Sequence, residues 1–330
     1  MTYRVIDPGT PDADCAAPKE HPMNRRHIIS SLALSTMASA TSGGRARRVA
    51  ALPCGRVAFV DQGAGPAALF IHGFPLSSFQ WRHTVERLSP FRRCLAPDLL
   101  GLGETWVAPG QAMTPIDQAR MLAALLEYLG VQEVDLVAND SGNAIAQLFA
   151  VDNPGRVRTL LLTNGDSEPD CPPAPLRPVL QLATEGRLAD EVFVRWANDP
   201  ASARAPSGFG GLCYQHPEFL TNENVRIYLQ PLVATPERKA LLNAYAAGLA
   251  SNVLAGLATH LARLHVPTRI VWGMADGIFD SRMAHYLDRL FPQSRGVRRV
   301  AQGKLFWPEE YPNILEAELL RLWQVPLWRV

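Results

Sequence analysis

The sequence predicts an α/β fold in which a doubly wound, mostly parallel sheet carries helices on both faces. Short apolar runs alternate with stretches of helical spacing from residue 56 onward. Helical and Pro-rich sequence interrupts this rhythm over residues 167–262, and strand and helix patterns then resume. Strands that alternate with helices indicate parallel pairing, because each helix returns the chain across a face of the sheet.

The first elements lie between residues 56 and 97. Apolar runs at 56–61 and 67–72 predict two strands, and the turn residues 63–66 between them (Gly-Ala-Gly-Pro) predict a hairpin. Apolar side chains at helical spacing predict a helix over 77–88, and the apolar run 93–97 predicts the next strand.

The next helix has clear end signals. Thr114 can cap it, Pro115 suits its first position and Asp117 suits the positive end of its dipole. This helix is expected to end at Gly130. A strand at 134–138, a helix at 142–151 and a strand at 157–162 follow.

After the interruption, strands are expected at 268–272 and 297–301, and helices at 281–291 and 314–323. We therefore expect an α/β core built from residues 41–166 and 263–330. Residues 167–262 are expected to form a helical cap over the carboxyl-terminal edge of the sheet.

Residues 1–40 resemble an export leader. Arg25 and Arg26 precede a mildly apolar run from Ile28, which closes on the small residues 38–40 (Ala-Ser-Ala), as in a bacterial twin-arginine signal. Met23 is an alternative start. The apolar run is too short for a membrane anchor. The leader predicts a periplasmic or secreted protein, and a cytoplasmic one if this interpretation is wrong.

Composition excludes several classes of protein. Hydrophobic residues make up 47% of the 330 and charged residues 19%, which excludes a disordered or collagen-like chain. A net charge of +1 gives no reason to expect nucleic acid as a partner. Beyond the leader, no cysteines have C-x-x-C spacing, so no zinc or redox motif is predicted. Trp106 replaces the last glycine of a dinucleotide fingerprint after Gly101 and Gly103, so no nicotinamide cofactor is expected, and the sequence predicts no metal or cofactor. Free thiols are favoured over disulfides among Cys54, Cys94, Cys171 and Cys213.

The strand at 134–138 enters the sequence Ala138-Asn139-Asp140-Ser141-Gly142, which leads directly into a helix. This is the pattern of a nucleophile elbow, in which the residues two before and two after the nucleophile must be small. Ala138 and Gly142 satisfy that requirement around Asp140, whereas Ser141 would be flanked by two asparagines. We therefore expect a carboxylate nucleophile; the alternative is an Asp that only caps the helix or turn.

Three further motifs follow strands in a consistent order. His72-Gly73-Phe74-Pro75 ends one strand, the segment 98–103 follows the next, and Asp276 follows the strand at 268–272. Together with the elbow, these motifs resemble the α/β-hydrolase fold over residues 50–325, in its epoxide hydrolase and haloalkane dehalogenase branch. The resemblance implies that Asp140 forms a covalent ester with a small electrophile. It also implies that the backbone N–H groups of Phe74 and Ser141 stabilise the oxyanion.

In such enzymes a histidine after the last strand activates water, and here Asp276 would orient it. The matching segment of this chain places Leu305 at that position, and the last histidine is His285. Leucine cannot accept a proton, so the usual base for ester hydrolysis is absent. Asp276 then has no imidazole to orient, and Asp166 is an alternative acid.

Other polar residues offer weaker candidates for the missing base. His72 is expected to be structural, His216 to be exposed and His285 to lie outside the sheet. Lys304 neighbours Leu305 and is expected to be a surface lysine.

The predicted cap is rich in aromatic residues. Its tyrosines are candidates for protonating an opening epoxide oxygen, because the resemblance implies cap tyrosines in that role. The substrate-binding candidates are Tyr214, Tyr228, Tyr245, Trp196 and Leu305.

The expected substrate is a small apolar electrophile, with an epoxide favoured over an alkyl halide or ester. Ser141 and Phe74 occupy positions where dehalogenases usually hold the halide with Trp and Asn. The alternatives are an exported, non-catalytic small-molecule binder and non-hydrolytic chemistry in the same pocket.

Overall fold

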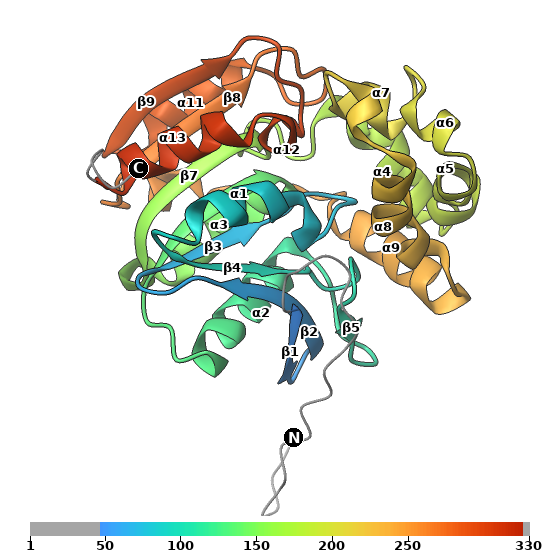
Figure 1. The fold of residues 1–330 in the computed structure, drawn as a ribbon, viewed down its shortest axis with the longest axis horizontal. Helices are drawn as coiled ribbons and strands as arrows, with labels where there is room; N and C mark the ends of the chain where they lie inside the picture. The colour runs from blue at the N-terminus through green and yellow to red at the C-terminus, as the bar shows by residue number, and fades with distance from the viewer. Residues whose placement is uncertain (1–46, 326–330) are drawn as a thin grey trace, which may run out of the picture. The chain divides into compact units, whose positions relative to one another are not determined.

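The computed structural model describes residues 47–325, and the predicted export leader lies outside them. In this range the strands form one sheet in the order β1-β2-β4-β3-β6-β7-β8-β9, with β5 beside β2 (Figure 1). The strands are β1 (Arg47–Leu52), β2 (Gly55–Gln62), β3 (Ala67–Ile71), β4 (Arg93–Pro97), β5 (Trp106–Val107), β6 (Val134–Asp140), β7 (Val157–Gly165), β8 (Thr268–Gly273) and β9 (Ser294–Val300).

The pairing of β2 corrects one prediction. The expected hairpin between the strands at 56–61 and 67–72 does not form, because β4 lies between them in the sheet. Instead β2 pairs antiparallel with β1 and β4, while β3 pairs in parallel with β4 and β6. All five residues of β3 are buried, and a central parallel strand allows this burial on both faces.

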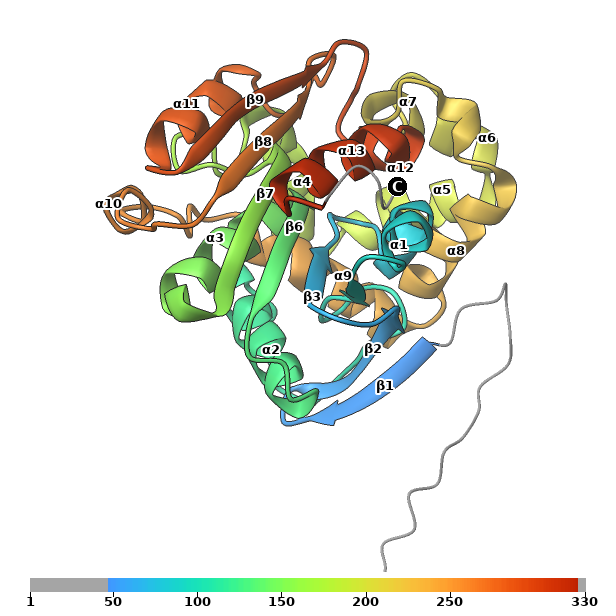
Figure 2. The same cartoon turned by 60° about the vertical axis from the view of Figure 1, so that its left-hand side comes forward.

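Helices cover both faces of the sheet, as the sequence predicts. The helices of the core are α1 (Arg82–Leu88), α2 (Pro115–Tyr128), α3 (Ser141–Asp152), α11 (Arg282–Leu290), α12 (Trp307–Glu310) and α13 (Pro312–Leu322). Figure 2 shows α2, α3 and α11 on one side of the strands and α1 and α13 on the other. Two apolar clusters fill these two interfaces.

The ends of α2 follow the expected cap chemistry. Thr114 and Asp117 form a reciprocal capping box, and Pro115 occupies the first turn. Gly130 follows with a φ of 65°, a left-handed conformation that favours glycine at the end of a helix.

Residues 167–262 contain helices and turns but no named strand. Most of the insertion, as we call this segment, lies beside one end of the sheet in Figure 1. Its helices are α4 (Arg177–Thr184), α5 (Val194–Asn198), α6 (Pro200–Arg204), α7 (Phe209–Cys213), α8 (Asn222–Val233), α9 (Pro236–Gly248) and α10 (Ala258–Leu261), with a π-helical turn, η4, at Ala189–Phe193. Shorter 3-10 turns are η1 (Ser78–Trp81), η2 (Pro154–Arg156), η3 (Ala174–Leu176) and η5 (Pro217–Phe219).

Within residues 47–325, no helix combines the length and the apolar character needed to cross a bilayer. The cysteines in this range are all free thiols, in agreement with the favoured prediction. No cluster of three or more His, Cys, Asp or Glu side chains in the same range could hold a metal ion.

Candidate active site

Asp140 lies at the sharp turn between β6 and α3. Its backbone has φ 58° and ψ −130°, a combination that non-glycine residues rarely adopt and that marks strain at functional sites. The turn needs a small residue after it, because a Cβ on Gly142 would lie 2.6 Å from the carbonyl oxygen of Ile71. The local geometry is therefore that of a nucleophile elbow centred on Asp140.

Backbone N–H groups hold the carboxyl group of Asp140. The N–H of Phe74 donates to Oδ2 over 2.7 Å, and the N–H of Ser141 also donates to this group. Gly73 allows the close approach, since a Cβ there would lie 2.6 Å from Oδ2. The two donors predicted for an oxyanion hole thus converge on the side chain of Asp140.

The Asp140 cavity, as we call the space next to this side chain, has a volume of about 90 Å³. Most of its walls are apolar and come from the insertion and from the loops after β3, β7 and β8. The lining residues are Phe74, Pro75, Asp140, Ser141, Asp166, Pro172, Pro173, Leu176, Val179, Leu180, Phe193, Trp196, Phe209, Leu212, Cys213, Leu249, Ile278 and Leu305. This lining contains two carboxyl groups but no histidine, lysine or arginine.

Burial changes the acidity of both lining carboxyl groups. Desolvation, followed by the nearby charge of Asp166, raises the pKa of Asp140 well above its ordinary range. Desolvation also raises the pKa of Asp166 to about 7, although the Cys171 thiol donates a hydrogen bond that opposes the shift. Both carboxyl groups therefore hold a proton more tightly than an exposed carboxyl group does.

Asp276 is held beside the site by donors from two sides. Asn164 Nδ2 donates to its Oδ2 over 2.9 Å, and the backbone N–H of Ile278 donates to its Oδ1 over 2.8 Å. Burial raises the pKa of Asp276 to about 6 despite these bonds. Asp276 is not among the residues that line the cavity, so Asp166 is the second carboxyl group exposed to a ligand there.

Leu305 lies in the cavity wall and is only 2% exposed. Its backbone carbonyl accepts a hydrogen bond of 3.0 Å from Asn139 Nδ2. The neighbouring Lys304 donates through Nζ to the carbonyl oxygen of Gly211 over 2.7 Å, so its amine is directed to the backbone of the insertion.

His72 has the structural role that the sequence predicts. Its Nε2 accepts from the backbone N–H of Leu99 over 3.0 Å, so Nδ1 carries the proton and donates to Gly73 O. Burial lowers the pKa of His72 to about 4, which keeps the ring neutral at neutral pH. His216 and His285 are both outside the cavity lining; His216 contacts Glu218, and His285 contacts Arg299.

Two of the predicted substrate-binding tyrosines have other partners. Tyr214 donates to Glu309 Oε2 over 2.7 Å, and Tyr228 donates to Oε1 of the same residue over 2.8 Å. Arg82 forms an ion pair with Glu309 as well. Neither tyrosine lines the Asp140 cavity, because the buried carboxylate of Glu309 draws both hydroxyl groups towards the core.

The other aromatic candidates lie at the site. Trp196 lines the cavity and packs edge-on against Phe193 with a centroid distance of 5.3 Å. Tyr245 stacks on Phe74 at 5.6 Å, and its hydroxyl lies 3.1 Å from Ser141 Oγ. Tyr245 therefore contacts both donor residues of the Asp140 carboxyl group, although it is not a lining residue.

Sequence reasoning missed the buried residues that organise this site. Asn139 connects Gln80, Thr163 and Leu305, and Asn164 connects β7 to β8 and to Trp307. Both asparagines stand near the carboxyl ends of mostly apolar strands, and that pattern is the signal that could have identified them.

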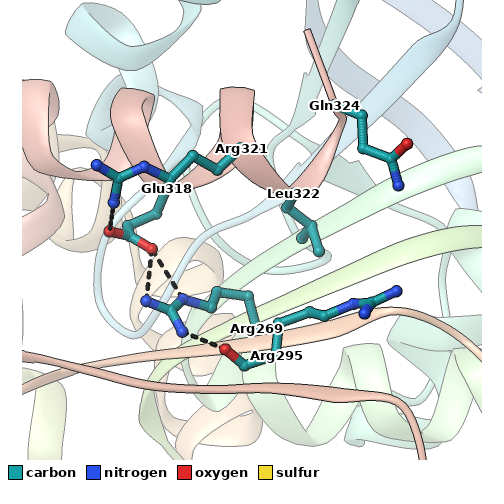
Figure 3. A pocket seen from close by; sticks show the side chains of 6 residues that line it. All are labelled: Arg269, Arg295, Glu318, Arg321, Leu322 and Gln324. Carbon is teal, nitrogen blue, oxygen red and sulfur yellow. Dashed lines mark hydrogen bonds and ion pairs between the residues drawn. The ribbon is translucent and has the colours of Figure 1, made fainter.

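A second, arginine-rich pocket lies elsewhere on the core (Figure 3). In it Arg269 and Arg321 both form ion pairs with Glu318. Arg269 stands near the start of β8, whereas Asp276 follows the end of that strand, so this pocket belongs to the opposite edge of the sheet. It contributes no residue to the Asp140 cavity.

Comparison with known proteins agrees with this geometry. The profile of the alpha/beta hydrolase fold family matches residues 66–307, most of the chain. A haloalkane dehalogenase of Mesorhizobium japonicum is 42% identical over 31% of this chain and 33% of its own length. Epoxide hydrolase 1 of Siraitia grosvenorii is 34% identical over 53% of this chain and 56% of its own length. The matched segments thus span from one third to just over half of these two relatives.

Longer matches have lower identity. Haloalkane dehalogenase 2 of Mycobacterium bovis is 27% identical over 81% of this chain and 91% of its own length. A solved thermophilic esterase of Thermogutta terrifontis is 26% identical, with a TM-score of 0.65 over 84% of this chain and 97% of its own. The epoxide hydrolase CorEH superposes with a TM-score of 0.70 at 20% identity, over 84% and 98% of the two chains. The chain therefore belongs to the alpha/beta hydrolase fold family, and the relatives that it resembles in sequence include haloalkane dehalogenases and epoxide hydrolases.

Proposed function

We propose that this protein attacks a small apolar electrophile through Asp140 and forms a covalent alkyl ester. The observation that carries the proposal is the placement of a carboxyl group on a strained elbow at the wall of an apolar cavity. An apolar cavity suits a substrate without charge, and an epoxide is the favoured class because it needs no halide-binding side chain. Alkyl halides and activated esters are less favoured substrates.

The hydrogen bonds from Phe74 and Ser141 support the chemistry after the attack. Asp140 reacts as the carboxylate, and one of its oxygens then becomes the carbonyl oxygen of the ester. When water adds to that carbonyl, negative charge develops on its oxygen, and backbone N–H groups at this carboxyl group stabilise that charge. Such a donor contributes about 3–4 kcal/mol of transition-state stabilisation in well-studied hydrolases.

Intact-mass spectrometry tests the proposal directly. Incubation with 1,2-epoxybutane should add the mass of one epoxide to the wild type, and peptide mapping should assign it to Asp140. The Asp140→Asn variant should show no such adduct, while Asp152→Asn, a change at an exposed carboxylate, should react as the wild type does. Absence of both an adduct and a hydrolysed product across epoxides, alkyl halides and activated esters would contradict the proposal.

A second candidate function is reversible, non-catalytic binding of a small molecule. The presence of Leu305 in the cavity wall favours it, since leucine cannot activate water. A binder would retain the ligand without any covalent mass change, and Asp140→Asn would leave its affinity for an apolar ligand largely unchanged. The same mass measurement, combined with calorimetry, therefore separates the two functions.

A further inference from the structure

We propose that Asp166 carries out both proton transfers of the reaction, first as the acid that protonates the opening epoxide oxygen and then as the base that activates water. The inference rests on the proposed function, because it concerns the formation and breakdown of the Asp140 ester. It assigns to one carboxyl group the proton transfers for which this cavity offers neither a histidine nor a tyrosine.

The sheet places Asp166 next to Asp140. Asp140 pairs with Gly165 across β6 and β7, and the backbone N–H of Asp166 donates to the carbonyl oxygen of Asp140 over 3.4 Å. Gln147 Nε2 fixes the other side of this backbone by donating to the Asp166 carbonyl over 2.9 Å. Asp140 and Asp166 both line the same cavity, so one ligand in it can contact both residues.

The alternative proton donors and acceptors are engaged elsewhere. Tyr214 and Tyr228 donate to Glu309, and Lys304 donates to a backbone carbonyl of the insertion. Cys213 does line the cavity, but burial raises the pKa of its thiol well above the ordinary range and makes it a poor acid. Among the described lining residues, Asp166 is the remaining group that can both give and accept a proton.

Burial raises the pKa of both carboxyl groups, and the reaction uses the state in which Asp166 holds a proton while Asp140 is ionised. Desolvation raises the pKa of Asp166 to about 7, and Asp166 in turn raises that of Asp140. A group that titrates near neutral pH can act as an acid in one step and as a base in the next. The titratable groups that face Asp166 are Asp140, Asp170, Cys171 and Tyr245, and none is a cation.

In the first step, the Asp140 carboxylate attacks an epoxide carbon and the ring C–O bond breaks. Asp166 gives its proton to the leaving oxygen, which leaves a hydroxyalkyl ester on Asp140 and a carboxylate on Asp166. In the second step, that carboxylate removes a proton from water as the hydroxide oxygen bonds to the ester carbon. The tetrahedral intermediate then expels the diol oxygen, which takes the proton of the new Asp140 carboxylic acid. One epoxide and one water yield one diol, and Asp166 ends protonated as it began.

Two electrophiles of matched size distinguish the acid role from the base role. 1-Bromobutane releases bromide and needs no acid, whereas 1,2-epoxybutane needs a proton on its oxygen. In Asp166→Asn, the butyl adduct should form at nearly the wild-type rate, and the epoxide adduct should form about 100-fold more slowly. Both adducts should break down at least about 100-fold more slowly than in the wild type, as followed by intact mass after removal of free reagent. Asp152→Asn, at an exposed carboxylate outside the cavity lining, is the control and should behave like the wild type.

The outcomes separate this inference from the proposed function. If Asp166→Asn forms and loses its adducts at wild-type rates, the inference is wrong while the Asp140 ester stands. If the wild type neither forms an adduct nor converts 1,2-epoxybutane to its diol, the proposed function fails, and this inference fails with it. Equal slowing of bromide and epoxide alkylation would refute the acid role specifically.

A measurement on the wild type covers the case in which Asp166→Asn does not fold. The ester of Asp140 carries no charge, so its breakdown should follow the ionisation of Asp166 alone. The breakdown rate should rise with pH through about 7, the pKa of Asp166, and level off above it. A rate that is independent of pH between about 5 and 9 would overturn the base role.

Discussion

Asn139 Nδ2 donates to the backbone carbonyl of Leu305 over 3.0 Å, although the two residues are 166 positions apart in the chain. This bond joins the residue before Asp140 to the residue that replaces the expected histidine. The same amide group also donates to Thr163 Oγ1, and its oxygen accepts from Gln80. The carboxyl ends of β6 and β7 and the loop before α12 are therefore held in one polar network.

Truncation of Asn139 should lower the free energy of unfolding by more than the loss of a few side-chain atoms implies. Asn139→Ala leaves the amide of Gln80 and the carbonyl of Leu305 buried without this partner, and we expect a loss of about 2–3 kcal/mol in the free energy of unfolding. Urea denaturation measures the change. Asn153→Ala removes one partly exposed bond to Phe149 O and should cost less than about 1 kcal/mol. Equal losses in the two variants would refute the network role of Asn139.

A methyl group at Gly73 should disturb the site directly. In Gly73→Ala the new Cβ would lie 2.5 Å from the Cβ of Asp140, so one of the two residues must move. We expect a loss of about 1–3 kcal/mol in stability and slower adduct formation at Asp140. Gly155→Ala is the control, since no atom lies within 4 Å of a Cβ at that position. If Gly73→Ala is alkylated at the wild-type rate, the close approach of residue 73 to Asp140 is not required for the reaction.

Loss of a tyrosine hydroxyl at Glu309 should affect stability rather than chemistry. Tyr214→Phe removes one hydrogen bond to a buried carboxylate, which should cost about 1.5–3 kcal/mol. Since Tyr214 does not line the Asp140 cavity, the rate of adduct formation should remain within about twofold of the wild type under conditions where the variant is folded. Tyr128→Phe, at a side chain that is 55% exposed, provides the control for thermal unfolding. A large loss of alkylation in Tyr214→Phe would contradict this prediction and indicate that Tyr214 takes part in the reaction.

Replacement of Leu305 by histidine should add a base beside the ester. In Leu305→His, the imidazole would stand in the cavity wall, and breakdown of the Asp140 adduct should accelerate by about 100-fold. Leu305→Gln is the matched control, because an amide of similar size is polar but cannot accept a proton near neutral pH. Single-turnover decay of the adduct compares the two variants. Equal acceleration by glutamine would mean that polarity, and not proton transfer, limits the reaction.

Much of the fold could be predicted because its signals are local. The apolar run of β6, the small residues around Asp140 and the cap residues Thr114 and Asp117 each act over a few positions. The pairing of β2 could not be predicted in this way. Both the expected hairpin and the observed order satisfy the local pattern, and only the burial of β3 between two parallel neighbours distinguishes them.

The residues of the site also fall into a group that could be predicted from sequence and a group that could not. Asp140, Phe74 and Ser141 could be grouped from sequence, because the elbow and the loop after β3 follow strands in a recognisable order. The partners of Tyr214 and Tyr228 could not be predicted from sequence, since aromatic residues at helical spacing pack equally well against a cavity or a core. Both tyrosine hydroxyl groups donate to Glu309, which lies more than 80 residues away in the chain, and these bonds hold the tyrosines in the core.

By itself, the sequence determined the alternation of strands and helices, the acidic elbow and the leucine at position 305. Periodicity, turn chemistry and side-chain identity are properties of short segments, so they need no knowledge of distant contacts. Only the tertiary structure decided that Asp166 lines the cavity with Asp140, that Asp276 does not, and that two tyrosines bind Glu309. These relationships depend on hydrogen bonds between buried polar groups on strands and helices that are far apart in the chain. The free energy of such bonds depends on the distances and the burial that the folded structure imposes.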